Sequence, residues 1–278
     1  AAAGSDAEDQ ALFDAVSAVG EEFCPALGIA IPVGKDSLSM QTRWQQSGAE
    51  QRVVSPLTLI VSGFAPVDDV RRTLTPVLQI HAHSVLVLLE FGQRRLGGSC
   101  LAQVYSQLGD VAPDVDDAEA FKELLNWLLE AKREGLILAL HDRSDGGVIT
   151  SLLEMAFASR QGLDINVAAG EDLLAALFNE EIGFVAQVEE SRLGELQAAA
   201  PCVCTPIAQL RDDDVISISQ SGASVVEYPR AQLQQWWANT SYHMQRLRDN
   251  EHCADEEIAD IALSRNQDPG LNSQLTFD

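Results

Sequence analysis

The sequence has few basic residues, and this shortage limits the partners that it can bind. Eighteen lysines and arginines stand against 42 aspartates and glutamates, which gives a formal net charge of −24. A field of this sign repels the phosphates of DNA and RNA, so we do not expect a nucleic-acid partner. A small polyphosphate fits this charge only where a helix start and a divalent cation invert the local sign, so we expect such a ligand to bring Mg²⁺.

The sequence also has few cysteines and no long apolar run. The five cysteines are scattered, which is typical of a reduced cytoplasmic protein rather than of a disulfide framework. Cys202 and Cys204 form a C-x-C pair without a further ligand at metal-binding spacing, so we interpret them as two side chains on one strand face. No run of about 18 uncharged apolar residues occurs, and the opening AAAGSDAEDQ lacks a signal-peptide pattern. We therefore expect neither a membrane span nor secretion.

The first part of the chain predicts one helix and two or three strands, which is too little for an independent core. Apolar residues recur at helical spacing over residues 8–23. Residues 28–33 predict a short strand, and residues 53–65 predict a long β-rich run that Pro56 interrupts. We therefore expect residues 1–76 to belong to a domain whose beginning is missing.

From residue 77 onward, strands and helices interleave, so we predict a mixed α/β (α+β) fold whose sheet is covered by helices on one face. Apolar strands are expected at residues 84–91, 136–140, 163–168, 184–189, 203–210 and 214–219. Helices are expected at residues 96–109, 118–135, 171–179 and 190–199, and after Gly147. We assign residues 77–229 to this second domain, and residues 230–278 to a long helix over 230–248 followed by an acidic connector.

The motif HDRSDGG at residues 141–147 stands where the apolar strand LILAL ends and an apolar helix begins. The strand would deliver Asp142 to its end, where open sheets bind ligands, and one well-placed carboxylate suffices for Mg²⁺ from the protein side. Ser144 and the two glycines leave a hydroxyl and backbone N–H groups for a phosphate. The plainer alternative, helix capping, explains Asp145 well but Asp142 poorly, because an unpaired buried carboxylate is costly.

Three further motifs give weaker signals. LGGS at 96–99 begins a helix with glycines, a geometry that suits an anion but also plain packing. GKDS at 34–37 offers Gly34 for backbone access and Ser37 as a phosphate donor, although it lacks the first glycine of a P-loop. The adjacent glutamates of NEE at 179–181 are compatible with metal binding or, more commonly, with solvated charges at a helix end.

Taken together and in this order, five motifs resemble phosphoribosylformylglycinamidine synthase, the large single-chain enzyme of purine biosynthesis: IPVGKDSLSM, VSPLTLIVSGFA, LGGS, LILALHDRSDGG and LFNEEIGFVAQV. The likeness extends through WW…MQRLRDN to the final DPGL…LTFD. Because members of this family are far longer, the resemblance identifies the chain as an internal fragment. It implies that residues 1–76 are part of an aminoimidazole-ribonucleotide-synthetase-like N-terminal-type subdomain, that residues 77–229 are the following C-terminal-type subdomain, and that the tail leads toward a glutaminase domain.

The resemblance also implies a function and site residues. The whole enzyme would be an ATP- and Mg²⁺-dependent ligase of the glutamine amidotransferase family that converts formylglycinamide ribonucleotide, glutamine and ATP to formylglycinamidine ribonucleotide. By this likeness Asp142 is a Mg²⁺ ligand and Ser144 contacts a nucleotide, in an auxiliary pocket that holds ADP outside the catalytic centre. Gly34 and Ser37 match residues that touch nucleotide and substrate, whereas Lys35 replaces an asparagine that binds metal in smaller relatives, so we expect no metal there.

The expected partners are ATP or ADP, formylglycinamide ribonucleotide and the remaining domains of the enzyme. No catalytic residue is assigned within the chain, because the family's nucleophile and other Mg²⁺ ligands would lie outside it, and the fragment alone is expected to be inactive. Two alternatives stay open. The chain is compatible with a non-catalytic scaffold that a nucleotide stabilises, or with a related ATP-dependent synthetase, although such chains carry a glycine-rich first half that this sequence lacks.

Overall fold

The computed structural model describes residues 1–4, 6–80, 83–91 and 93–268, and it divides the chain into two compact units. The smaller unit comprises residues 1–70 and 117–123, and the larger unit comprises residues 71–116 and 124–278. Residues 269–278, which carry most of the DPGL…LTFD motif, lie outside the described residues. The expected three-part division at residues 76 and 229 stays a prediction.

A helical segment opens the smaller unit and confirms the helix expected at residues 8–23. Its parts are α1 (Asp6–Ser17), the π-helix η1 (Ala18–Phe23) and α2 (Cys24–Leu27). The segment ends at Gly28, whose φ of 75° lies in the left-handed region that glycine adopts without a side-chain clash. Phe23 stacks on Phe121 with ring centroids 6.5 Å apart, which covers one side of the segment.

A β-hairpin follows, joining β1 (Gln41–Gln46) to β2 (Ala49–Val54). Its turn residues Ser47 and Gly48 both have positive φ, at 56° and 79°. This is the geometry of a two-residue hairpin turn, which matches the natural twist of the two strands. The Ser-Gly pair in the sequence is a turn signal of this kind.

The strands expected at residues 28–33 and across residues 55–65 do not form. Val33, Ile60 and Phe64 are 81%, 86% and 97% exposed, so these apolar side chains gain no burial within the described part of the smaller unit. A β-branched run adopts strand structure only when neighbouring strands and a packed face stabilise it. The expected strands are wrong because, among the described residues, no neighbouring strand supports the β-propensity of these segments.

The larger unit is built on a sheet that, within the described residues, has seven strands and is mostly antiparallel, which confirms the mixed α/β class. In spatial order the strands are β4 (Ala139–Asp142), β6 (Gly183–Glu189), β3 (Ser84–Glu90), β7 (Val203–Arg211), β5 (Gly162–Val167), β8 (Val215–Gln220) and β9 (Ala223–Pro229). Only the β5–β8 pair among these runs parallel.

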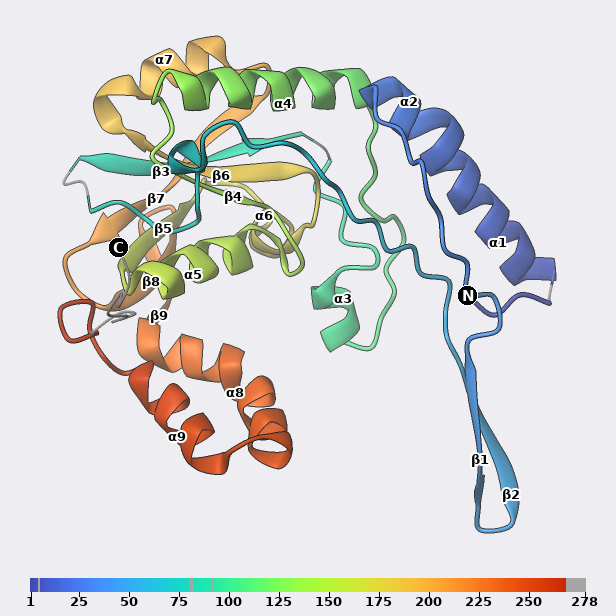
Figure 1. The fold of residues 1–278 in the computed structure, drawn as a ribbon. Coiled ribbons are helices and arrows are strands. Elements are labelled where there is room, and N and C mark those ends of the chain that lie inside the picture. Colours follow the sequence, from blue (N-terminus) through green and yellow to red (C-terminus); the bar gives the residue numbers. More distant parts are fainter. Residues whose placement is uncertain (5, 81–82, 92, 269–278) are drawn as a thin grey trace, which may run out of the picture. The chain divides into compact units, whose positions relative to one another are not determined.

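Helices cover both faces of this sheet, whereas the sequence pattern predicted cover on one face (Figure 1). One face carries α4 (Ala118–Arg133) and α7 (Leu193–Ala199), and the other carries α5 (Gly147–Ser159) and α6 (Leu173–Phe178). The reason lies in β3, in which all seven residues are buried. Because alternate side chains of a strand point to opposite faces, a continuous apolar run requires cover on both.

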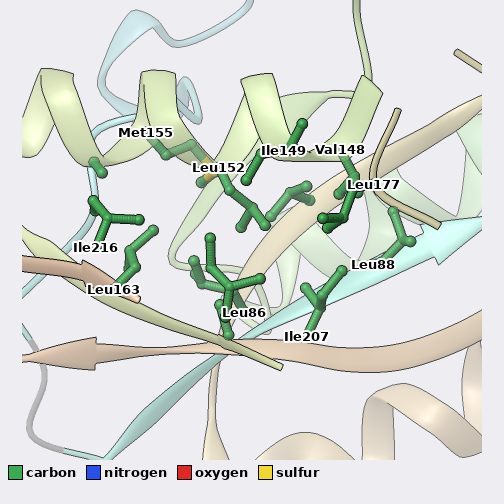
Figure 2. Close-up of a cluster of buried hydrophobic side chains, with 14 of the residues drawn as sticks. Leu86, Leu88, Val148, Ile149, Leu152, Met155, Leu163, Leu177, Ile207 and Ile216 are labelled. Carbon is green, nitrogen blue, oxygen red and sulfur yellow. The ribbon is translucent and has the colours of Figure 1, made fainter. Parts of the chain in front are cut away.

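The core between α5 and the sheet fixes the position of that helix (Figure 2). Leu152 and Met155 of α5 are fully buried, as are Leu86 of β3 and Leu163 of β5 beneath them. Core side chains pack at crystal-like density, so α5 has little freedom to shift along the sheet. The turn that precedes α5 is therefore held in place by the packing of the whole helix.

The helix expected at residues 96–109 is reduced to α3 (Cys100–Val104). Gly97 and Gly98 bond through their backbone N–H groups to the carbonyl oxygens of Val111 and Leu108, which folds the segment back on itself. A side chain at Gly97 would lie 2.4 Å from the Val111 backbone, so this close return needs glycine. Two further short helices are η2 (Val70–Arg72) and η3 (Glu190–Arg192).

The tail forms two helices, and the second of them lies within the expected acidic connector, for which no helix was predicted. The long helix α8 (Arg230–Arg248) has the predicted bounds, but α9 (Glu251–Asp260) follows it. The fully buried Arg230 donates to the carbonyl oxygens of Ile261 and Leu263, just past the end of α9. These bonds between distant residues satisfy carbonyl groups that a helix end leaves open. Among the described residues, none of the helices is both long and apolar enough to cross a bilayer.

Candidate functional site: the turn between β4 and α5

The turn between β4 and α5 is held from both sides by one serine of the helix. Asp142 is the last residue of β4, and α5 begins at Gly147. The Ser151 hydroxyl donates to the carbonyl oxygen of Asp142 at 2.9 Å, and it accepts the N–H of Ser144 at 3.4 Å. The residues that the sequence singled out as Mg²⁺ ligand and nucleotide contact are thus brought together on one fixed turn.

The two glycines of the turn serve its backbone conformation and its packing. Gly146 and Gly147 have φ of 87° and 78°, a region that other residues rarely adopt. A side chain at Gly147 would lie 2.6 Å from the carbonyl oxygen of Leu177 and 2.7 Å from the backbone of Phe178. The second glycine is therefore required where the turn touches the end of α6.

Asp142 presents an oxygen donor to solvent. Its side chain is 68% exposed, and its Oδ1 lies 3.2 Å from Nδ1 of His141. Mg²⁺ commonly takes one or two carboxylates and completes its shell with water and phosphate oxygens, so this carboxylate fits the ion. Within the described residues, no group of three or more His, Cys, Asp or Glu side chains could hold a metal ion. The turn thus offers an open, one-carboxylate position.

Gly34 and Ser37 belong to the smaller unit, in an exposed segment without regular structure. The Lys35 ammonium donates to the Ser37 hydroxyl at 3.3 Å, and both side chains are exposed to solvent. Asp142 and Ser144 therefore lie in the larger unit, and Gly34 and Ser37 lie in the smaller unit. The site described below is that of the larger unit.

Arg143, the residue between Asp142 and Ser144, points into the protein and was not singled out by the sequence. Its side chain is fully buried, and it donates to Glu90 Oε2 at 2.9 Å and to the carbonyl oxygens of Glu181 and Ile182 at 2.5 and 2.9 Å. Burial lowers the pKa of Arg143, and the charge of Glu90 opposes this effect. An arginine stays charged under these conditions, so the turn is anchored by a buried cation.

Glu180 fills the position at which a free anion would meet the turn. One oxygen of its carboxylate accepts the backbone N–H of Gly146, which caps α5, and the N–H of Cys100, which begins α3, each at 2.8 Å. The anion that LGGS and HDRSDGG can receive at these N–H groups is therefore a side chain of the same protein. A helix start favours such a carboxylate because its N–H groups point outward and carry partial positive charge.

Glu181 is buried rather than solvated. Only 1% of its side chain is exposed, and Arg95 donates to it from Nε at 2.6 Å and from Nη2 at 2.8 Å. Burial alone would raise the pKa of Glu181, but the hydrogen bonds and charge of Arg95 outweigh burial and lower it. The interpretation of NEE as solvated charges is therefore wrong for this residue, whose carboxylate completes an internal ion pair.

We expect the Glu181–Arg95 pair to make stability depend on acidic pH. Since the folded-state pKa of Glu181 is lowered, the unfolded chain binds the proton more readily, and stability falls as the pH drops below about 4.3, the ordinary glutamate pKa. Glu181→Gln should lower stability at pH 7 and flatten its decline between pH 5 and 3, as measured by urea unfolding at each pH.

Glu195→Gln is the control for this pH dependence. That carboxylate pairs with Arg192 at the surface and is 50% exposed, so solvent screens the pair and the substitution should change little. Equal pH curves for the wild-type protein and Glu181→Gln would show that the buried pair does not carry the effect.

A hollow of about 600 Å³ lies beside this ion network but does not include the predicted site residues. It is lined by Glu90, Phe91, Arg94, Ala200, Pro201, Cys202 and Val203. Glu90 lies 3.3 Å from Arg94 and 2.9 Å from Arg143, so its carboxylate is shared by two arginines. The negative charge of this carboxylate at the edge of the hollow is therefore balanced by two arginines.

Two family models match the chain. One, described as the FGAR-AT PurM_N-like domain, matches residues 1–66, and the other, described as the C-terminal domain of AIR synthase related protein, matches residues 82–219. Residues 82–219, which include the β4–α5 turn, thus match an AIR synthase related C-terminal domain. With the FGAR-AT PurM_N-like domain ahead of it, the chain belongs to the PurL-like family of phosphoribosylformylglycinamidine synthases.

Solved structures show the same fold. PurL of Thermotoga maritima complexed with FGAR is 17% identical with a TM-score of 0.51, and the match covers 59% of this chain and 30% of that one. PurLQS from Thermotoga maritima is 14% identical with a TM-score of 0.55, and the match covers 77% of this chain and 34% of that one. The matched region is about a third of these longer proteins, so their activities are not assigned to this chain by likeness of fold.

Proposed function

We propose that the chain contributes part of the synthetase module of an ATP-dependent ligase that converts formylglycinamide ribonucleotide, glutamine and ATP to formylglycinamidine ribonucleotide. The FGAR-AT PurM_N-like match at residues 1–66 and the AIR synthase related match at residues 82–219 support this proposal. A related synthetase of another pathway is less well supported, because the first of these models is specific to the FGAR-AT type. The scattered cysteines, all free in the described structure, fit a cytoplasmic enzyme.

Within that module, we propose that the β4–α5 turn is an auxiliary nucleotide–Mg²⁺ pocket. The observation that carries this proposal is the exposed carboxylate of Asp142 at the end of β4, two residues before Ser144 on a turn that Ser151 holds in place. Bound Mg²⁺ would neutralise phosphate charge there, which an acidic protein needs in order to hold a nucleotide. Asp142 would hold the ion, and Ser144 would contact the nucleotide. Gly34 and Ser37 stay proposed contacts to nucleotide and substrate.

We expect Asp142→Asn in the full-length enzyme to weaken Mg²⁺-dependent ADP binding by at least roughly tenfold. Loss of a residue that only hydrogen-bonds a metal ligand already weakens metal binding by about this factor, so loss of the ligand itself should cost at least as much. The fold should be retained, because the side chain is exposed and the two residues are nearly equal in size. Isothermal titration with ADP in the presence and absence of Mg²⁺ measures the effect.

Asp145→Asn is the matched control, since it removes one carboxylate from an exposed position of the same turn. Its ADP affinity in Mg²⁺ should stay close to that of the wild-type enzyme. An unchanged dissociation constant for Asp142→Asn would reject the ligand assignment. If Asp142→Asn loses ADP and thermal stability while turnover is preserved, the pocket has a scaffold role rather than a catalytic one.

A further inference from the structure

The start of α5 is already occupied by a carboxylate. Gly146 N–H and Cys100 N–H both bond to the same oxygen of Glu180 at 2.8 Å, so two backbone donors from two separate elements converge on one anion. α5 has 13 residues, long enough for its start to carry a positive partial charge. A phosphate oxygen seeking these N–H groups would have to displace Glu180 from them.

Two further carboxylates lie on the turn to which Glu180 bonds. Asp142 and Asp145 lie on the same turn, and both are exposed. Burial, followed by the charge and hydrogen bond of Glu180 and the charge of Asp145, raises the pKa of the Cys100 thiol. The Cys100 sulfur therefore experiences a negative field at the place where the backbone N–H groups would otherwise attract an anion.

We propose that Glu180 is a specificity-determining residue that closes the start of α5 to bare anions, so that a nucleotide enters this turn only together with a divalent cation on Asp142. The hydrogen bonds of Glu180 support the first part, and the second part rests on the function proposed above. Glu180 acts by occupying the N–H groups and by its charge. The cation then supplies the attraction for phosphate that the helix start cannot supply.

The test is Glu180→Gln in the full-length enzyme. The side-chain oxygen of glutamine still accepts both N–H groups, so the turn keeps its hydrogen bonds and loses only the charge. The ratio of the ADP dissociation constant without Mg²⁺ to that with Mg²⁺ should fall by roughly tenfold, because a charge-assisted bond no longer has to be displaced. Isothermal titration measures both constants.

Asp145→Asn is the control here too, because it removes a charge from the same turn without touching the N–H groups. If Asp145→Asn lowers the ratio as much as Glu180→Gln does, the effect is general electrostatics and the proposal is overturned. If the wild-type enzyme binds ADP with Mg²⁺ and Glu180→Gln leaves the ratio unchanged, the proposed role of Glu180 is wrong. The proposed nucleotide–Mg²⁺ pocket would still be supported.

A second measurement does not depend on nucleotide binding. The rate at which iodoacetamide alkylates Cys100 at pH 8, followed by peptide mass spectrometry, reports the charge at residue 180, because only the thiolate reacts. Glu180→Gln should raise this rate severalfold and Asp145→Asn should raise it less. Faster alkylation with no ADP binding in any variant would reject the pocket but support Glu180 as the resident anion, and an unchanged rate would reject Glu180 in that role.

Discussion

Gly147→Ala is expected to destabilise the protein by about 3–5 kcal/mol, a loss in the range reserved for the most severe single substitutions. The added carbon would lie 2.6 Å from the carbonyl oxygen of Leu177 and 2.7 Å from backbone atoms of Phe178. These are main-chain atoms at the end of α6, so neither can move aside as a flexible side chain would. The positive φ of 78° adds backbone strain to the steric conflict.

Gly170→Ala separates these two effects. Gly170 has nearly the same φ, 81°, but a side chain there would meet nothing within 4 Å. Its substitution should cost only about 1–2 kcal/mol, the strain of the left-handed backbone. Urea unfolding of the purified protein compares the two, and equal losses would mean that contact with α6 does not constrain the turn.

Arg143→Met is expected to cost about 3–5 kcal/mol, because it leaves Glu90 and two carbonyl oxygens without their buried donor. Methionine fills much of the volume of the arginine stem, so the loss reports charge and hydrogen bonds rather than a cavity. Removal of the Glu90 charge should restore part of the stability that Arg143→Met loses. We expect the double variant Arg143→Met with Glu90→Gln to be more stable than the sum of the single effects implies.

Arg133→Met provides the surface comparison. Arg133 pairs with Glu130 where both side chains are more than half exposed, at 57% and 61%. Such pairs contribute about 0–1 kcal/mol, so this variant should unfold close to the wild-type urea midpoint. A loss in Arg143→Met no larger than this would show that the buried network does not anchor the β4–α5 turn.

Three residues of the motif HDRSDGG have different roles in the structure. Asp142 faces solvent and offers an oxygen, Arg143 anchors the turn inside the protein, and Gly147 lets α5 start against α6. Glu180 accepts the N–H of Gly146, whereas the N–H of Gly147 bonds to the carbonyl oxygen of Ser144. The motif, for which the sequence predicts a Mg²⁺ ligand at Asp142 and a nucleotide contact at Ser144, thus lies beside a helix start whose Gly146 N–H already bonds to Glu180.

Local pattern was sufficient to find this turn. An apolar run followed by HDRSDGG and a second apolar run predicted a strand, a turn and a helix, and β4 does end at Asp142 while α5 does begin at Gly147. The long helix α8 was equally readable, since its bounds coincide with residues 230–248. Such elements depend mainly on residues that are adjacent in sequence, so the sequence pattern predicts them without knowledge of the fold.

Partners distant in sequence were not readable. Arg143 donates hydrogen bonds to Glu90, 53 residues away in the sequence, and to Glu181, 38 residues away. No local sequence pattern indicates these contacts. The helix α9, within the expected connector, was also not predicted, and it is held at its end by Arg230, 31 residues before Ile261. The strands expected across residues 55–65 did not form, because this apolar β-rich run pairs with no neighbouring strand among the residues that the structure describes.

The sequence alone determined the mixed α/β class, the family likeness, and the position of the turn with Asp142 and Ser144 on it. Periodicity and turn residues act over a few positions, so they fix which elements form. Only the tertiary structure decided that helices cover both faces of the sheet, that Arg143 is buried, and that Glu180 occupies the start of α5. These features depend on contacts between segments far apart in the chain, which form only when burial and charge pairing are satisfied together.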